Sequence, residues 1–166
     1  MKVNIPITKP YLGEDEKRLI SEVIDSGWIS QGPMVAEFEK KFAEYVGAKY
    51  AVATTSCTTA LHAALSVFGI GSGDEVIVPS LSFIATANAV VHCEATPVFV
   101  DIDPETCNID VNKIEKAITQ KTKAIMPVHQ MGLPAEIDSI KKIAAKHGLK
   151  IIEDAACAIG STYRGK

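Results

Sequence analysis

Residues 75–101 read EVIVPSLSFIATANAVVHCEATPVFVD, and this stretch decides the fold. A short run dominated by Val and Ile, 75–78, stops at Pro79 and is followed by an alanine-rich segment, 83–92, with the composition of a buried helix. A second β-prone run, 96–101, comes next. A strand, a helix and a further strand in this order form a right-handed crossover between parallel strands. We therefore expect a parallel sheet around this unit.

The same alternation continues on both sides of this unit. Further strands are expected at 50–54, 123–128 and 149–153, and further helices at 58–68, 110–119 and 136–147. Nearly unbroken apolar strands separated by helices are typical of a parallel sheet with helices on both faces. The sequence thus predicts an α/β fold.

The segment before this alternation has a different pattern. Two amphipathic helices are expected at 13–26 and 35–46, joined by a turn-rich loop that carries the only tryptophan, Trp28. We therefore divide the chain into an N-terminal helical arm, 1–49, and an α/β body, 50–166.

Composition excludes several classes of protein. The chain has 166 residues, 47% of them hydrophobic, and a net charge of -3 in which neither sign is concentrated. A nucleic-acid surface and a membrane span are not expected, and the chain is predicted to be soluble and cytoplasmic. The four cysteines form no C-x-x-C pair, so we expect reduced, mostly buried thiols and no metal site.

The residues that follow each strand are the candidates for ligand binding, because ligands of such sheets lie at the carboxyl ends of the strands. The hydroxyl-rich run 54–59 enters a helix directly, which is suited to binding a phosphate. Ordinary N-capping by Ser56 or Thr58 is the alternative. The glycines of 69–73 follow a helix and precede a strand, the reverse of a dinucleotide-binding motif.

Two further side chains are expected at the same edge. Phe83 follows the 75–78 strand and is interpreted either as a core residue or as a surface for a flat ligand. Asp154 follows the last strand and either caps a helix or pairs with a buried cation. A phosphate site, an aromatic ring and an acid together fit pyridoxal 5′-phosphate, whose pyridine nitrogen must stay protonated.

These residues belong to a series of motifs that resembles the DegT/StrS family of nucleotide-sugar aminotransferases, which has the aspartate-aminotransferase fold (fold type I of the pyridoxal-phosphate enzymes). The motifs are Ser26-Gly27-Trp28-Ile29, Phe38-Glu39, Thr58-Thr59-Ala60-Leu61-His62, 73–79, 83–88, 97–102, Pro127-Val128-His129 and Glu153-Asp154-Ala155-Ala156. Each is weak alone, and their order and spacing make the resemblance specific. It implies pyridoxal phosphate as the cofactor and a homodimer as the assembly.

The resemblance also implies roles for single residues. Cofactor phosphate would be held by Ser56, Cys57 and Thr58, with Phe83 stacked on the ring and Asp154 paired with the pyridinium. The substrate would contact Trp28 and His129. Two positions depart from the family: relatives usually carry Asn-Gly where this chain has Ser56-Cys57, and Gln, His or Glu where it has Cys157, a position near the cofactor.

The lysine that forms the Schiff base in this family would lie beyond Lys166, so the chain is expected to be the N-terminal part of a longer parent protein and inactive alone. The parent would transfer an amino group, typically from glutamate, to a keto group of a nucleotide-linked sugar, for polysaccharide or amino-sugar synthesis. Two alternatives stay open: a sugar dehydratase with histidine in place of that lysine, and a truncated binding or scaffold domain.

Overall fold

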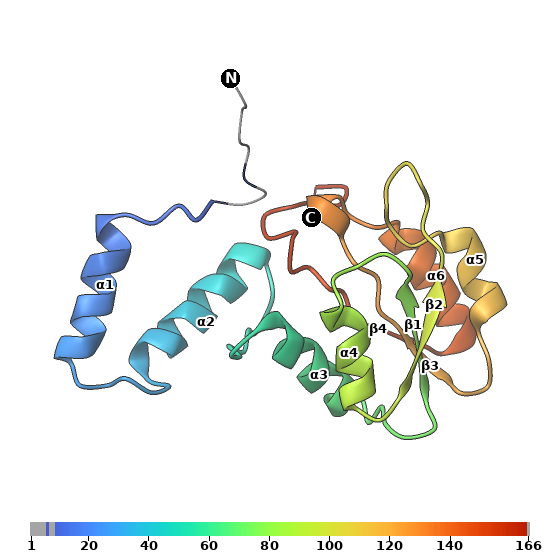
Figure 1. The fold of residues 1–166 in the computed structure, drawn as a ribbon, viewed down its shortest axis with the longest axis horizontal. Helices are drawn as coiled ribbons and strands as arrows, with labels where there is room; N and C mark the ends of the chain where they lie inside the picture. The colour runs from blue at the N-terminus through green and yellow to red at the C-terminus, as the bar shows by residue number, and fades with distance from the viewer. Residues whose placement is uncertain (1–5, 7–8, 166) are drawn as a thin grey trace. The chain divides into compact units, whose positions relative to one another are not determined.

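The computed structural model describes residue 6 and residues 9–165 of the chain (Figure 1). The chain forms two compact units, Met1–Ala53 and Thr54–Lys166. The first unit contains α1 (Glu14–Asp25) and α2 (Pro33–Val46). Both helices were expected from the sequence, and α2 ends as predicted at Gly47, which has the left-handed φ of 70° that favours glycine.

The loop between α1 and α2 is built around Trp28. Its indole Nε1 donates a hydrogen bond to the carbonyl of Gln31 at 3.0 Å. The ring lies against the backbone of Gly32 so closely that a Cβ there would be 2.1 Å from Nε1. Glycine is therefore required at position 32 by the close approach of the indole ring.

The second unit holds the sheet. In chain order its elements are α3 (Cys57–Val67), β1 (Glu75–Pro79), α4 (Ala85–His92), β2 (Thr96–Val100), α5 (Val111–Ala117), β3 (Thr122–Ile125), the 3-10 helix η1 (Gln130–Gly132), α6 (Ile137–His147) and β4 (Lys150–Ile151). The strands are all parallel and lie in the order β2-β1-β3-β4. The predicted α/β class and parallel sheet are confirmed.

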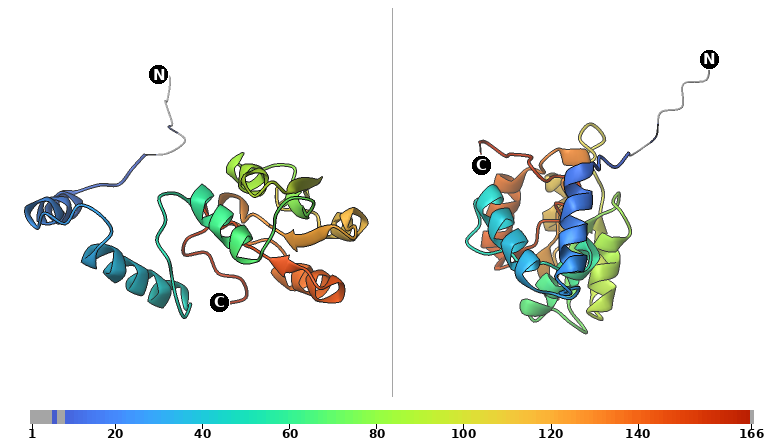
Figure 2. Two further views of the ribbon diagram at one scale, coloured as in Figure 1. Left: turned by 90° about the horizontal axis from the view of Figure 1, so that it is seen from below. Right: turned by 90° about the vertical axis from the view of Figure 1, so that its left-hand side faces the viewer.

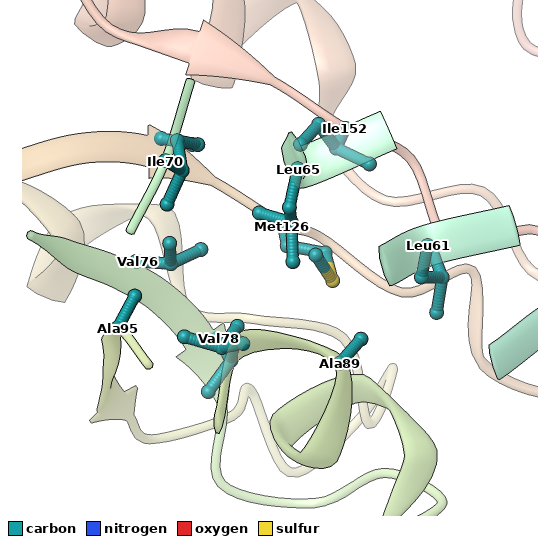
Figure 3. Close-up of a cluster of buried hydrophobic side chains, with 11 residues drawn as sticks. Leu61, Leu65, Ile70, Val76, Val78, Ala89, Ala95, Met126 and Ile152 are labelled. Atoms are coloured by element: carbon teal, nitrogen blue, oxygen red, sulfur yellow. The ribbon is translucent and has the colours of Figure 1, made fainter. Parts of the chain in front are cut away.

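Helices cover both faces of the sheet, as expected, because successive strand residues point to opposite sides. Val76 and Val78 of β1 face α3 and α4, in a cluster that includes Leu65, Ala89 and Met126 (Figure 3). Ile77, between them, faces the other way, into a second cluster with residues of α5 and α6. The view from below in Figure 2 shows the sheet between α4 and α6.

One predicted strand is wrong and two are shorter than predicted. Residues 50–54 form no strand, since none of the described residues pairs with them and an extended segment becomes a strand only by pairing. The strands expected at 123–128 and 149–153 are reduced to β3 and β4, followed by an isolated bridge between Val128 and Asp154. Among the described residues, no helix has the length and apolar character that a membrane span requires.

Candidate functional site

The backbone at Asp154 is fixed by pairing between the segments that follow β3 and β4. The Asp154 N–H donates to the carbonyl of Pro127 at 2.9 Å, and the Asp154 carbonyl accepts from the N–H of His129 at 3.1 Å. These bonds continue the parallel ladder beyond the strands themselves. Asp154 is therefore held at the carboxyl edge of the sheet, where the sequence placed it, and it is only 5% exposed.

Three donors from separate parts of the second unit meet the Asp154 carboxylate. The hydroxyl of Thr86, on α4, donates to Oδ2 at 2.8 Å. The backbone N–H of Ala156 donates to Oδ1 at 3.2 Å, and the thiol of Cys57, the first residue of α3, lies 3.8 Å from Oδ1 as a weak donor. A buried carboxylate needs such partners, and here they come from α3, α4 and the chain after β4.

The start of α3 carries the hydroxyl-rich run. Ser56 caps the helix, because its Oγ accepts from the N–H of Thr59 at 3.2 Å. Its Oγ also lies 2.7 Å from Thr59 Oγ1, which in turn lies 3.0 Å from Thr55 Oγ1. Within the described part of the chain, the N–H groups of Cys57 and Thr58 meet no acceptor. The predicted capping is present, and two backbone donors remain for an anion.

Cys57 joins this helix start to the buried acid. Burial, and then the negative charge of Asp154, raise the pKa of the Cys57 thiol. Cys57 and Cys157 are both exposed, while Cys93 and Cys107 are partly buried. The expectation of mostly buried thiols was therefore wrong, because two of the four cysteines lie at the open edge of the sheet and not in the apolar clusters.

Phe83 and Cys157 lie on the loops around this edge. Phe83 precedes α4, and its carbonyl accepts from the N–H of Thr86 at 3.2 Å. Its side chain is 78% exposed, so the interpretation as a core residue is wrong. Cys157 follows Asp154 in a loop packed on η1, where Ser161 Oγ donates to the carbonyl of Gly132 at 2.7 Å. Cys157 is near enough to Cys57 for its charge to raise the pKa of that thiol further.

His129 is buried, and other groups of the same unit engage both of its ring nitrogens. The N–H of Ala135 donates to Nδ1 at 3.1 Å, so Nδ1 carries no proton. Nε2 then carries the proton and faces Oε2 of Glu153 at 3.0 Å. This hydrogen bond lowers the pKa of Glu153. Trp28, the other predicted substrate contact, belongs to the first unit.

Thr86 is not among the site residues predicted from the sequence, although the sequence carries a signal for it. The buried residues of α4 are Thr86, Ala89 and Val90, at positions i, i+3 and i+4 of one helix face. A hydroxyl on the buried face of an alanine-rich helix needs a polar partner. A buried hydrogen-bond partner for Thr86 is thus predictable from the sequence, but the identity of that partner, Asp154, is not.

Comparison with known proteins identifies relatives of this chain. The chain is 53% identical over 163 residues to GDP-perosamine synthase of Caulobacter vibrioides, and the aligned region covers 98% of this chain and 44% of that relative. It is 51% identical over 160 residues to the spore coat polysaccharide biosynthesis protein SpsC of Bacillus subtilis, covering 96% of this chain and 41% of that protein. The chain thus spans less than half the length of these relatives.

Solved structures give the same result for the fold. DesV of S. venezuelae superposes with a TM-score of 0.90 at 44% identity, over 92% of this chain and 41% of DesV. NtdA of Bacillus subtilis, solved with its cofactor PMP bound, superposes with a TM-score of 0.88 at 43% identity, over 92% of this chain and 35% of NtdA. The sheet described above is therefore an incomplete form of this aminotransferase fold.

The model of one protein family matches residues 10–166, which is nearly the whole chain. This match confirms the resemblance that the sequence motifs indicated, and it includes both the start of α3 and Asp154. The chain belongs to the DegT/DnrJ/EryC1/StrS aminotransferase family.

Proposed function

We propose that the parent protein is a pyridoxal-phosphate-dependent aminotransferase that moves an amino group, with glutamate as donor, to a keto group of a nucleotide-linked sugar. Relatives with the names GDP-perosamine synthase and spore coat polysaccharide biosynthesis protein support the sugar substrate. Bound PMP in NtdA supports the cofactor. The products would be used in polysaccharide or amino-sugar synthesis, and the parent would act as a homodimer.

The observation that carries the proposal is the buried carboxylate of Asp154 beside the N-terminus of α3. A carboxylate that is 5% exposed and has no basic side chain among its hydrogen-bond partners in the described residues is costly to bury. A protonated ring nitrogen would supply the missing positive charge. The contact between Cys57 and Asp154 supports a shared site, because the start of α3 and the acid are then close enough for one ligand to touch both.

The residues present fit the cofactor. The N–H groups of Cys57 and Thr58 would bind its phosphate, because they are unused and lie at the positive end of the α3 dipole. The exposed ring of Phe83 would stack on the pyridine. Cys157 would lie beside the cofactor, and Asp154 would hold the proton on the ring nitrogen. When bound, the cofactor supplies the aldehyde that carries the amino group and a ring that withdraws electrons.

Two of the proposed roles concern residues away from this contact. Trp28 is proposed to contact the sugar substrate through its exposed indole face. His129 is proposed to contact the substrate at the carboxyl edge of the sheet without a hydrogen bond from its ring, since both of its ring nitrogens are already bonded within the protein. Lys166 lies outside the described residues, and the lysine needed for catalysis is expected further along the parent protein.

Replacing Asp154 by Asn in the parent protein tests the proposal. The substitution keeps the size of the side chain and removes its charge, so we expect amino transfer from glutamate to the keto sugar to fall by ~10²–10³-fold, the scale for an essential electrostatic partner. The measurement is turnover with a nucleotide-linked keto sugar, monitored by appearance of the amino sugar.

Asp110→Asn is the matched control, because Asp110 caps α5 through Asn112 and Asn is an equally good cap. Near-normal turnover in the Asp154→Asn variant would refute the pairing with a ring nitrogen. Loss of water from the sugar without amino transfer by the unaltered parent would favour the dehydratase.

A further inference from the structure

Ser82 and Thr86 form a pair of hydroxyls that ends on the buried acid. Thr86 is 1% exposed, and its Oγ1 lies 2.8 Å from Oδ2 of Asp154. Ser82, which precedes α4, places its Oγ 2.7 Å from the same Thr86 oxygen. The pair therefore connects the loop before α4 to the carboxylate at the carboxyl edge of the sheet.

The direction of these bonds follows from the number of protons. An ionised carboxylate only accepts hydrogen bonds, and a threonine hydroxyl has one proton to give. Thr86 must use that proton for Oδ2 of Asp154, so its oxygen accepts the proton of Ser82. Both hydroxyls are thereby oriented toward the acid.

The two oxygens of Asp154 are not equally occupied. Among residue 6 and residues 9–165, Oδ1 has the N–H of Ala156 and the thiol of Cys57 as donors, whereas Oδ2 has only the hydroxyl of Thr86. A carboxylate oxygen accepts about two hydrogen bonds. One acceptor position is therefore left, and it is on Oδ2.

Packing alone does not require a hydroxyl at position 86. The neighbouring buried residues of α4 are Ala89 and Val90, and valine has nearly the shape of threonine. Burying a hydroxyl is costly unless it is hydrogen-bonded. The hydroxyl of Thr86 is thus best explained by its bond to Asp154.

We infer that Thr86 is a positioning residue that holds the Asp154 carboxylate so that Oδ2 keeps one acceptor position for the ring N–H of the cofactor, with Ser82 fixing the orientation of the Thr86 hydroxyl. This inference rests on the proposed function, because the ring N–H belongs to the proposed cofactor. It assigns to α4 a role in setting the direction of the acid, in addition to its packing on the sheet.

The test compares Thr86→Val, Thr86→Ser and Thr122→Val in the parent protein. Thr122 is the matched control, because it is also buried and its hydroxyl faces a carboxylate, Glu75 Oε2, at 3.4 Å, but it begins β3 at the opposite end of the sheet. We expect Thr86→Val to bind pyridoxal phosphate ~10-fold more weakly than Thr122→Val, the scale of a lost hydrogen bond to a charged group. Thr86→Ser should restore the affinity.

A second readout needs no cofactor. The pKa of Cys57 depends on the charge of Asp154, so the pH dependence of Cys57 alkylation by iodoacetamide, mapped by mass spectrometry, reports on the carboxylate. In Thr86→Val the hydrogen bond from the Thr86 hydroxyl to the Asp154 carboxylate is lost. The negative charge of Asp154 then has one donor fewer to neutralise it, so it raises the pKa of the Cys57 thiol more strongly. We expect the midpoint in Thr86→Val to rise relative to Thr122→Val, so that alkylation of Cys57 below the midpoint is ~3-fold slower.

The two readouts separate the inference from the proposed function. Affinity and Cys57 midpoint in Thr86→Val that match those of Thr122→Val overturn the positioning role, even if the parent binds the cofactor. A parent protein that binds no pyridoxal phosphate overturns the proposed function and the cofactor part of the inference. A shifted Cys57 midpoint in that case still establishes that Thr86 holds the carboxylate.

Discussion

At the scale of single residues, the central contact is between an acid and a thiol that lie 97 positions apart in the chain. Asp154 is buried. Its negative charge raises the pKa of the Cys57 thiol, in addition to the rise that burial of the thiol itself causes. Burial and this charge therefore both disfavour the thiolate of Cys57, although its side chain is exposed. This contact makes Cys57 a natural reporter of the state of the acid.

We predict that Asp154→Asn makes Cys57 more reactive. Removing the negative charge removes the second cause of the raised pKa, so the pKa of Cys57 falls, while the effect of burial remains. Alkylation of Cys57 near neutral pH should become several-fold faster, as measured by peptide mapping over a pH series. The control is Asp110→Asn at the start of α5, and equal rates in the two variants would contradict the assignment.

The place of several site residues in the fold could be predicted from the sequence, because the order of strands and helices determines which residues follow each strand. The carboxyl ends of parallel strands share one edge, so the residues after each strand, including Phe83 and Asp154, are brought to that edge by topology alone. Thr86 and Ala156 follow no such rule. The contact of Thr86 depends on the phase of α4 against the sheet, and that of Ala156 depends on a turn of the backbone.

At the scale of elements, the sequence predicts helices better than strand lengths. Asp110 caps α5 and Gly148 ends α6 in the left-handed conformation, and local residues determine both features. Strands depend on partners that are distant in sequence. Residues 50–54 have the composition of a strand, yet they pair with none of the described residues.

The C-terminal segment offers a test of packing against the α5–α6 side of the sheet. Tyr163 packs on this second cluster, and its buried hydroxyl has no hydrogen-bond partner among the described residues. We predict that Tyr163→Phe raises the free energy of unfolding by ~1 kcal/mol, because it removes an unsatisfied polar group and leaves the ring in place. Urea unfolding measures the effect, with the exposed Tyr50→Phe as control, and a loss of stability would show that the hydroxyl has a partner.

The connection after β4 should make stability depend on pH. The hydrogen bond from His129 lowers the pKa of Glu153 below its usual 4.5. A lowered carboxyl pKa stabilises the fold above the usual value, and this stabilisation is lost as the pH falls through the lowered pKa. We predict that Glu153→Gln is less stable than the unaltered chain at about pH 7, and that this difference in stability shrinks as the pH falls toward about pH 3.

Urea unfolding at the two pH values measures this difference. Glu105→Gln, in an exposed loop, is the control and should show no dependence of this kind. A difference that stays constant from neutral to acid pH would mean that the Glu153 charge does not contribute.

At the scale of the whole molecule, the sheet ends at β2 on one side and at β4 on the other. Among the described residues, no strand pairs with the outer side of β2 or of β4. Phe99 of β2 is 58% exposed. Unpaired edges and exposed apolar side chains favour association with another chain.

We therefore predict that this chain self-associates as its concentration rises, and that Phe99→Lys reduces the association by adding a charge to the β2 edge. Light scattering over a concentration series measures it. Gln120→Lys adds the same charge in the exposed loop before β3 and should have little effect. A monomer at every concentration would contradict the prediction.

The 97-residue separation between Cys57 and Asp154 also has a consequence for synthesis on the ribosome. At ~5–20 residues per second, the acid emerges about 5–20 s after the helix start that it contacts. During that interval α3 emerges first and α4 follows, both without the carboxylate that links them. A nascent chain therefore has both backbone donors of the α3 start well before it has the acid that we propose to pair with a protonated ring.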